Sequence, residues 1–317
     1  MKYIFGPVPS RRLGLSLGVD LVPQKLCSLN CLYCECGKTP DSGLVIHRDE
    51  YILMDDILSE LDEYLLPGPE LDYITLTGSG EPTLNSRIGD IIQYLKQKYP
   101  RYKLALLTNG TLLWDTKVQE EILPVDLIVP SLDAVSDNIF DKINKPEPGL
   151  DNNKIINGII EFRKKYRGVF WLEVFIVPGI NDGIEELGLL KEKIDLINPD
   201  KVHLNALDRP PAFDNVKKPP LEKLEEIRDF FLPHRTDIIA KYTGSTKSKN
   251  VDLNKAVDKV RVQVLGVLKR RPSTLEDLSH TLDIDEDIIK PYIEKMLSEN
   301  KIKSLTLDRG EFYSIAD

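Results

Sequence analysis

Short apolar segments alternate with amphipathic ones from residue 16 to about residue 235. The apolar segments are rich in Val, Ile and Leu, which is typical of parallel strands buried on both faces. They occupy residues 16–23, 73–77, 103–108, 127–132, 171–177 and 201–205. Helical periodicity lies between them, at residues 51–66, 87–99, 153–166 and 187–197. The alternation predicts an α/β fold with a parallel sheet, either open and doubly wound or closed into a complete or partial barrel.

The pattern changes after residue 240. Residues 241–250 are polar and lack periodicity, so we interpret residues 241–251 as a linker. Three helical segments and a hairpin follow, at residues 258–272, 274–284, 285–302 and 303–315. The first segment stops at Pro272, and Thr274 with Asp277 offers a capping-box start to the second. We therefore predict a core domain at residues 1–240 and a small winged helix-turn-helix domain at residues 252–317.

Composition narrows the class of protein. The chain has 317 residues, 41% of them hydrophobic and 29% charged, and a net charge of −9. These values are ordinary for a soluble globular protein, and no apolar run is long enough to span a membrane. The N-terminus lacks the features of a signal peptide, so we expect a cytoplasmic protein with reduced thiols. From residue 252 onward 11 Lys/Arg face 13 Asp/Glu, which argues against DNA binding by this part.

All four cysteines lie within one ten-residue stretch, as Cys27, Cys31, Cys34 and Cys36. A zinc site usually takes four ligands as two separated pairs, and only His47 is nearby as a further candidate ligand. A redox pair of Cys31 and Cys34, or inert buried cysteines, are further alternatives. The spacing C-x3-C-x2-C most favours an iron–sulfur cluster held by three thiolates. Such a cluster keeps one iron free of protein ligands.

This cysteine motif, with Tyr33 just before Cys34, resembles the signature of the radical S-adenosylmethionine (SAM) superfamily. The resemblance implies a [4Fe–4S] cluster bound by Cys27, Cys31 and Cys34, whose unique iron binds SAM. An electron from the reduced cluster then cleaves the sulfonium and produces a 5′-deoxyadenosyl radical that abstracts hydrogen. It also implies a partial (β/α)6 barrel and a reducing partner such as a ferredoxin or flavodoxin. Cys36 falls outside the triad, and we interpret it as a spare thiol.

Polar groups follow the later strands, where ligands bind in such folds. Gly78 and Gly80 allow close approach of a ligand, and Glu81 places a carboxylate beside it. Superfamily members have a Gly-Gly-Glu here that receives the amine of SAM, whereas this chain reads Gly-Ser-Gly-Glu. After the next strand, Thr108 and Asn109 suit ribose or carboxylate contacts, or simply a turn.

The remaining strand ends continue the series. Ser131 and Asp133 alternate, so both are expected to face one side, where a bound ligand would satisfy them. The segment "FIVPGIND" resembles the one beside adenine in glycyl-radical activating enzymes, which places Val177 at the adenine. The last predicted strand leads into "HLNALDRPP", where His203, Asn205 and Arg209 are candidate substrate contacts, although a lone histidine such as His203 is more often a core residue. The resemblance therefore assigns these residues to SAM: Tyr33, Gly80, Glu81, Asn109, Ser131, Asp133 and Val177.

The segment "FGPVPSRRLGLSLGVDLVP" and the ending "YCECG" resemble the branch related to archaeal wyosine-base enzymes, which act on transfer RNA. Arg11 and Arg12 precede the first predicted strand, either as a clamp for a carboxylate or phosphate or as solvated side chains. Wyosine-forming members carry cysteines for a second cluster, which four cysteines cannot provide. The substrate is left open between a transfer RNA base, a protein residue and a small metabolite. A cluster-containing DNA-binding regulator is the alternative from another class.

Overall fold

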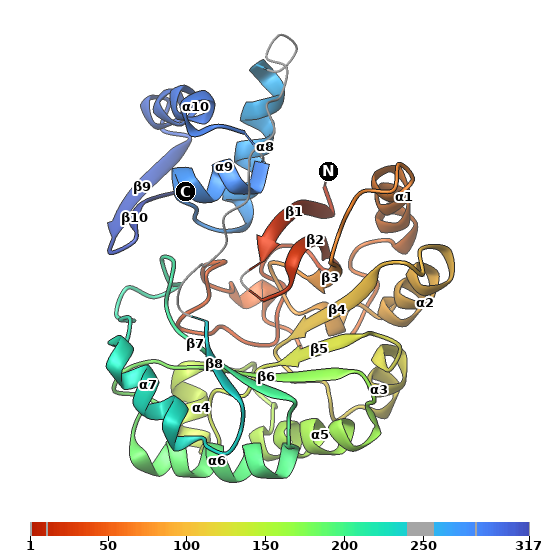
Figure 1. Ribbon diagram of the computed structural model, residues 1–317, viewed down its shortest axis with the longest axis vertical. Coiled ribbons are helices and arrows are strands. Elements are labelled where there is room, and N and C mark those ends of the chain that lie inside the picture. The colour runs from red at the N-terminus through yellow and green to blue at the C-terminus, as the bar shows by residue number, and fades with distance from the viewer. Residues whose placement is uncertain (1, 11, 240–256, 283, 317) are drawn as a thin grey trace.

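The computed structural model describes residues 2–10, 12–239, 257–282 and 284–316. Its larger sheet has eight strands in the order of the chain, with β1 and β8 at the two edges (Figure 1). β1 pairs antiparallel with β2, and every later neighbour is parallel. The strands are β1 Ile4–Ser10, β2 Gly14–Asp20, β3 Tyr73–Thr77, β4 Lys103–Thr108, β5 Leu127–Pro130, β6 Val169–Phe175, β7 Lys201–Asn205 and β8 Thr236–Ile238.

The predicted α/β class and parallel sheet are confirmed, and the six predicted strands correspond to β2–β7. The edge strands β1 and β8 were missed. β1 contains two prolines, which weaken any strand signal, and β8 is only three residues long. The first predicted strand also extended too far, because β2 ends at Asp20.

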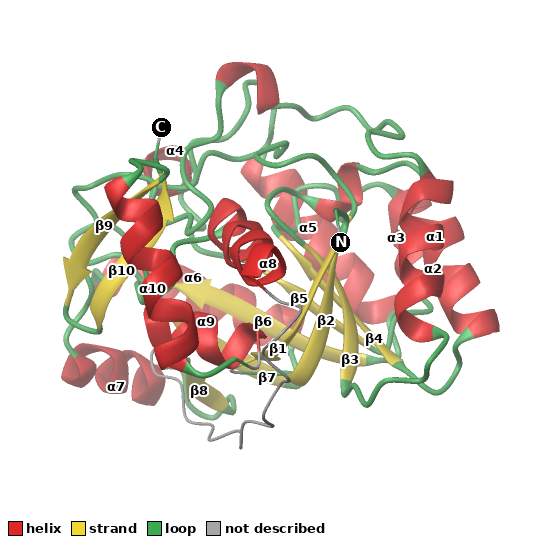
Figure 2. Cartoon of the chain, turned by 90° about the horizontal axis from the view of Figure 1, so that it is seen from above, coloured by secondary structure: helices red, strands yellow, loops and turns green. Residues whose placement is uncertain are grey.

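Seven of the described helices belong to the β/α part of the chain: α1 Met54–Leu65, α2 Ile88–Lys98, α3 Thr116–Ile122, α4 Asp137–Ile143, α5 Asn152–Lys165, α6 Ile184–Ile197 and α7 Leu221–Phe230. The longer ones cover the convex face of the curved sheet (Figures 1 and 2). Four match predicted segments, whereas α3, α4 and α7 were not predicted. α3 and α4 have only seven residues each, too few to show a clear period.

Alternation along the strands separates the two faces of the sheet. On β6, Leu172 and Val174 are fully buried in the main core with the helices, while Glu173 and Phe175 line a cavity on the other face. The concave face has its own small apolar cluster around Leu127 and Val129. Most of the residues that line this cavity carry polar side chains, so the concave face offers hydrogen-bonding groups to a ligand.

The C-terminal elements are three helices and a two-stranded antiparallel sheet: α8 Val257–Arg270, α9 Leu275–Leu282, α10 Glu286–Ser298, β9 Ile302–Leu307 and β10 Gly310–Ile315. They share a separate apolar core that includes Val264, Leu278 and Ile289. The capping box is confirmed, because the Asp277 amide donates to Thr274 Oγ1 at 3.1 Å and the Thr274 amide donates to Asp277 Oδ2 at 3.3 Å. The order of elements agrees with the predicted hairpin, whereas the winged-helix assignment stays a prediction.

We call residues 257–316 the C-terminal unit. α9 packs on β1, and the unit lies over the concave side of the sheet (Figures 1 and 2). Arg270 Nε donates to Asp20 Oδ2 at 2.9 Å, and the side-chain Nε2 of Gln24 donates to the Lys269 carbonyl at 2.6 Å. The predicted linker lies outside the described residues. Among the described helices, none combines the length and the apolar character needed to cross a membrane.

Candidate active site

The cysteine loop, residues 27–37, leaves β2 at the carboxyl ends of the parallel strands. Its backbone is tied on both sides. The Cys27 amide donates to the Gly43 carbonyl at 2.9 Å, and the Leu32 amide donates to the Ile143 carbonyl at 2.9 Å. All four cysteines are free and partly buried. The loop is therefore held in place by the fold and presents its thiols without any disulfide.

Each cysteine of the C-x3-C-x2-C motif accepts one side-chain N–H from a different segment. Lys25 Nζ lies 3.2 Å from Cys34 Sγ, Asn109 Nδ2 lies 3.5 Å from Cys27 Sγ, and Asn144 Nδ2 lies 3.4 Å from Cys31 Sγ. Asn109 was predicted as a cofactor contact, but Lys25 and Asn144 were missed. Asn144 caps the C-terminus of α4, a helix that the sequence pattern did not reveal.

Burial raises the pKa of Cys27 to about 12, and burial with nearby Asp133 raises the pKa of Cys31 well above its usual value. Cys34 differs, because a hydrogen bond from Cys36 lowers its pKa and the same contact raises that of Cys36. Metal ligands must be thiolates, so occupation of this site would release protons. Within the described ranges, no three His, Cys, Asp or Glu side chains converge as a single metal ion would require.

The loop after β3 packs directly on the cysteine loop. A Cβ atom on Gly80 would lie 2.1 Å from the Leu26 carbonyl oxygen, and the Glu81 amide donates to that oxygen at 3.0 Å. Gly78 has φ +137°, and a Cβ there would lie 2.0 Å from Asp20 Oδ1. Glycine is thus required at both positions because the loop after β3 packs closely against the end of β2 and the segment that follows it. This is in addition to the ligand contact that the sequence suggested.

Glu81 is almost completely buried, and this burial raises the pKa of its carboxyl group. Its carboxylate accepts hydrogen bonds from Thr83, from Thr108 Oγ1 at 2.7 Å, and from the Asn109 amide at 2.7 Å. Asn109 Oδ1 in turn accepts from the Thr111 amide at 3.0 Å. The three predicted residues Glu81, Thr108 and Asn109 therefore form one hydrogen-bonded group beside Cys27.

Asp133 holds a second such group on the other side of the cysteine loop. It accepts from Tyr33 Oη, from Asn144 Nδ2 at 2.8 Å, and from the Phe175 amide at 2.8 Å. Burial raises the pKa of Asp133 to about 6. The Tyr33 ring stacks on Phe175 with centroids 3.8 Å apart. Asp133 thus fixes both the aromatic residue of the motif and the amide that faces Cys31.

Ser131 and Asp133 lie beyond β5, which ends at Pro130, so the expectation that they alternate on one strand is wrong. Ser131 forms an isolated bridge with Glu173 of β6 and is half-buried, while Asp133 is buried. Val177 is buried, and its amide donates to Asn181 Oδ1 at 2.8 Å. These positions border the same edge of the sheet, and their contact with SAM stays a prediction.

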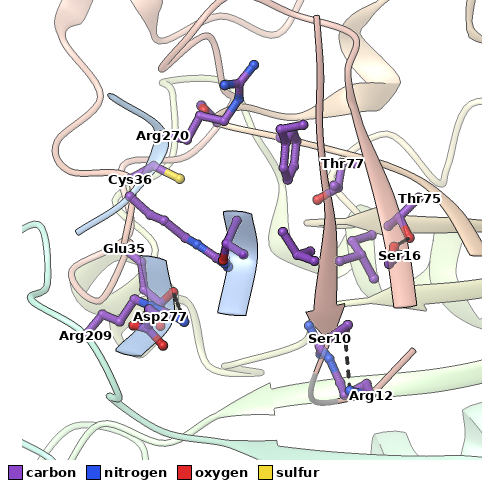
Figure 3. Close-up of a pocket in the computed structure, with 18 of the residues that line it drawn as sticks. Ser10, Arg12, Ser16, Glu35, Cys36, Thr75, Thr77, Arg209, Arg270 and Asp277 are labelled. Atoms are coloured by element: carbon purple, nitrogen blue, oxygen red, sulfur yellow. Dashed lines mark hydrogen bonds and ion pairs between the residues drawn. The ribbon is translucent and has the colours of Figure 1, made fainter. Parts of the chain in front are cut away.

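A cavity of about 360 Å³ lies between the cysteine loop, the concave face and the C-terminal unit (Figure 3). Cys34 and Cys36 of the cysteine loop line one part of it, together with Tyr33, Gly78 and Phe175. The strands and loops of the larger sheet contribute Ser10, Arg12, Ser16, Thr75, Thr77 and Asn205. The C-terminal unit contributes Arg270, Arg271, Asp277, His280 and Arg309. No residue of the C-terminal unit was among the predicted site residues, because sequence pattern alone does not show where a separate unit docks.

Arg12 is not a solvated surface residue, since it pairs with Glu173 with only 15% of its side chain exposed. Arg11 lies outside the described residues. His203 is buried against Trp171, with ring centroids 4.7 Å apart, and within the described part of the chain its Nδ1 has no hydrogen-bond partner. Burial, with Arg12 and Lys201, lowers its pKa to about 3, so it is a neutral core residue.

Arg209 belongs to a set of charges that we call the arginine network: Arg209, Arg309, Glu35, Asp208 and Asp277 (Figure 3 shows Arg209 with Glu35 and Asp277). Arg209 Nη1 lies 2.9 Å from Glu35 Oε2, and Arg309 Nη1 lies 2.5 Å from Asp208 Oδ2. Both arginines also pair with Asp277. Although burial opposes it, these two arginines hold the pKa of Asp277 below its usual value. The network joins the cysteine loop, the loop after β7 and the C-terminal unit.

Comparison with known proteins places this geometry in a family. Residues 21–190 match the Radical SAM superfamily. A UPF0026 protein of Methanocaldococcus jannaschii is 32% identical over 99% of this chain and 96% of its own length. A GTPase Obg of Brachyspira hyodysenteriae is 34% identical over 95% of this chain, which spans only 43% of that protein.

The fold agrees with these matches. A radical SAM methyltransferase from Sphaerobacter thermophilus has a TM-score of 0.55 at 16% identity, covering 70% of this chain and 66% of that one. At this identity the likeness concerns the fold. The family match and the cysteine motif together identify the cofactors as a [4Fe–4S] cluster and SAM. The chain belongs to the Radical SAM superfamily and is a radical SAM enzyme.

Proposed function

We propose that Cys27, Cys31 and Cys34 hold one [4Fe–4S] cluster and that SAM binds beside it at the cysteine end of the cavity. The observation that carries the proposal is the donor set: three free thiols on one anchored loop, each facing a side-chain N–H. Thiolates are the ligands that iron–sulfur clusters take, so the residues fit the group. Three ligands on a four-iron cluster keep one iron available to SAM.

When bound, the cluster supplies the electron that cleaves the sulfonium of SAM. The protein positions both groups and keeps water away. Asp133 orients the side-chain amide of Asn144, and Glu81 holds the main chain of Asn109. The remaining acceptor capacity of Glu81 Oε2 suits the amine of SAM. The stacked pair of Tyr33 and Phe175 forms an apolar wall at this end of the cavity, which suits the adenine.

The reacting group of the substrate is proposed to lie farther along the cavity, between the barrel hydroxyls and the C-terminal unit. Ser16 Oγ and Thr75 Oγ1 are 2.5 Å apart there, and Arg12 forms an ion pair with Glu173. A relative of lower identity, a GTP 3′,8-cyclase of Streptomyces coelicolor, is 25% identical over 171 residues. The cavity is in the range of small-molecule sites, which favours a small molecule or one protruding residue over a large folded surface.

The experiment uses the full chain, reconstituted anaerobically with iron and sulfide. We expect a brown protein with a Mössbauer spectrum of a [4Fe–4S] cluster, and formation of methionine and 5′-deoxyadenosine from SAM after reduction. Cys31→Ala should abolish both signals. A colourless protein that binds stoichiometric zinc, or a cluster whose four irons all carry protein ligands, contradicts the proposal.

A further inference from the structure

We propose that Lys25, Asn109 and Asn144 set the reduction potential of the cluster, each by donating a hydrogen bond to a different ligand sulfur. The inference rests on the proposed function, because it needs the cluster at Cys27, Cys31 and Cys34. It assigns a role to two residues, Lys25 and Asn144, that the sequence motif does not include. All three are positioning and tuning residues, since they act through the ligands.

The donors come from three separate places in the fold. Lys25 lies in the loop after β2, Asn109 follows β4, and Asn144 caps α4. Their nitrogen atoms reach the sulfurs of Cys34, Cys27 and Cys31 at 3.2, 3.5 and 3.4 Å. Since each donor is positioned by a different element, the one-to-one pairing is a property of the tertiary structure rather than of one loop.

The orientation of the two amides follows from their other partners. Asn109 Oδ1 accepts from the amide and hydroxyl of Thr111 at 3.0 and 2.8 Å, so its NH2 group faces Cys27 and Ser28. Asn144 places the same nitrogen 2.8 Å from the Asp133 carboxylate and 3.4 Å from Cys31 Sγ. A carboxylate can only accept here, so the NH2 group must be the one that faces the sulfur.

A buried carboxylate lies behind each asparagine. Glu81 Oε2 accepts the backbone N–H of Asn109 at 2.7 Å, and Asp133 Oδ2 accepts the side-chain Nδ2 of Asn144 at 2.8 Å. Glu81 therefore holds its asparagine through the main chain, whereas Asp133 holds the side-chain amide itself. Outer partners of this kind orient the groups that contact metal ligands and tune the metal centre.

Lys25 contributes a charge as well as a donor. It adopts φ +62°, a left-handed conformation that costs a non-glycine residue free energy, and its amide donates to the Ser79 carbonyl at 2.9 Å. This backbone brings its ammonium to Cys34. Hydrogen bonds and positive charge near the sulfurs stabilise the more electron-rich, reduced cluster, so they raise its reduction potential. Lys25 should have the largest effect of the three.

The test is an EPR-monitored redox titration of the reconstituted full chain with chemical mediators. Lys25→Met should lower the ratio of reduced to oxidised cluster at a fixed potential about tenfold, which is about 59 mV for a one-electron couple. Lys25→Arg should restore the potential. Lys38→Met is the matched control, because Lys38 is exposed in the same region and lies over the Phe213 ring rather than at a sulfur.

An unchanged potential in Lys25→Met at full iron content overturns the proposal. Failure of Lys25→Met to bind iron, while Lys38→Met binds it, also overturns it, because Lys25 would then serve assembly. Asn144→Leu should shift the potential in the same direction by a smaller amount, and an unchanged or higher potential or loss of iron removes Asn144 from the proposal. If the parent protein forms no [4Fe–4S] cluster at all, the proposed function itself has failed.

Discussion

The cysteine loop and the arginine network are adjacent, joined through Glu35 between Cys34 and Cys36, but their polar groups are satisfied in opposite ways. In the loop, soft sulfur acceptors receive one N–H each and retain the capacity to bind something more. In the network, two arginines and three carboxylates are paired with one another. The first region is built to hold a further group, whereas the charges of the second are paired within the protein. Within the described residues, Arg209 Nε lies 3.7 Å from Asp277 Oδ2 and has no hydrogen-bond partner.

The difference separates two kinds of role. Changes in the cysteine loop should alter what the protein binds, while the fold of the metal-free chain changes little. Changes in the arginine network should alter stability and the docking of the C-terminal unit, because its charges lie where unpaired ions are costly. Variants in each region therefore test whether the two regions have these separate roles.

The largest effect is expected from the cysteines themselves. Cys27→Ala should abolish iron binding in the reconstituted protein, because two thiolates cannot hold a four-iron cluster firmly. Cys36→Ala is the matched control on the same loop, and it should retain full iron and sulfide content. Chemical iron analysis and the visible absorption spectrum measure both. Equal loss of iron in the two variants would show that Cys36 is a ligand and that the triad is misassigned.

The next largest effect is expected in the arginine network. Arg209→Met removes the ion pairs of Arg209 with Glu35 and with Asp277, and the Arg209 side chain is just 8% exposed. Breaking a buried ion pair in this way should lower the free energy of unfolding by about 3 kcal/mol. Denaturant titration of the metal-free chain, followed by circular dichroism, measures the loss.

Arg261→Met provides the comparison for that variant. Arg261 pairs with Glu299 at 3.1 Å, and both side chains are 30% exposed. Exposed pairs contribute about 0–1 kcal/mol, so this variant should unfold close to the parent midpoint. Similar losses of unfolding free energy in Arg209→Met and Arg261→Met would mean that the arginine network contributes no more to stability than an exposed ion pair does, because solvent screens both alike.

These two regions also show what the sequence could and could not reveal. The cysteine spacing is local, so three candidate ligands could be predicted from ten residues together with the β/α alternation around them. Gly80, Glu81, Asn109 and Asp133 were found because strand ends meet at one edge of a parallel sheet. The structure places them at one edge of the sheet, and their contact with SAM stays a prediction.

The residues that sequence reasoning missed depend on distant contacts. Asn144 reaches Cys31 across 113 positions, and Arg270 reaches Asp20 across 250. No periodicity or motif encodes such a pairing, because it arises only when helices and units dock. Lys25 stands near the cysteines in the sequence, but its position follows from a left-handed backbone that a lysine rarely adopts.

A smaller effect concerns His203, a buried group in neither region. Its folded pKa of about 3 lies below the usual value of about 6.5, with burial as the first cause. As the pH falls below 6.5, the His203 imidazole becomes protonated in the unfolded chain. In the folded chain the same imidazole stays neutral until about pH 3. Stability from this group is therefore fully present above pH 6.5 and is lost on acidification, by about 2 kcal/mol at pH 5.

His203→Phe should remove that component while keeping a ring against Trp171. The measurement is the difference in unfolding free energy between pH 7 and pH 5, for the parent and the variant. We expect the variant to lose about 2 kcal/mol less than the parent. An equal loss in both proteins would mean that His203 is protonated in the folded state, and that its burial is relieved by solvent.

The smallest effect is expected at the capping box of α9, where Asp277 serves two purposes at once. Thr274→Ala removes the acceptor of the Asp277 amide and should cost about 1 kcal/mol. Asp277 also carries the ion pairs of the arginine network, so its position should depend on both contacts. A double-mutant cycle with Arg309→Met should therefore give a coupling of about 0.5 kcal/mol or more, measured by denaturant titration. Strict additivity would mean that the cap and the network hold Asp277 independently.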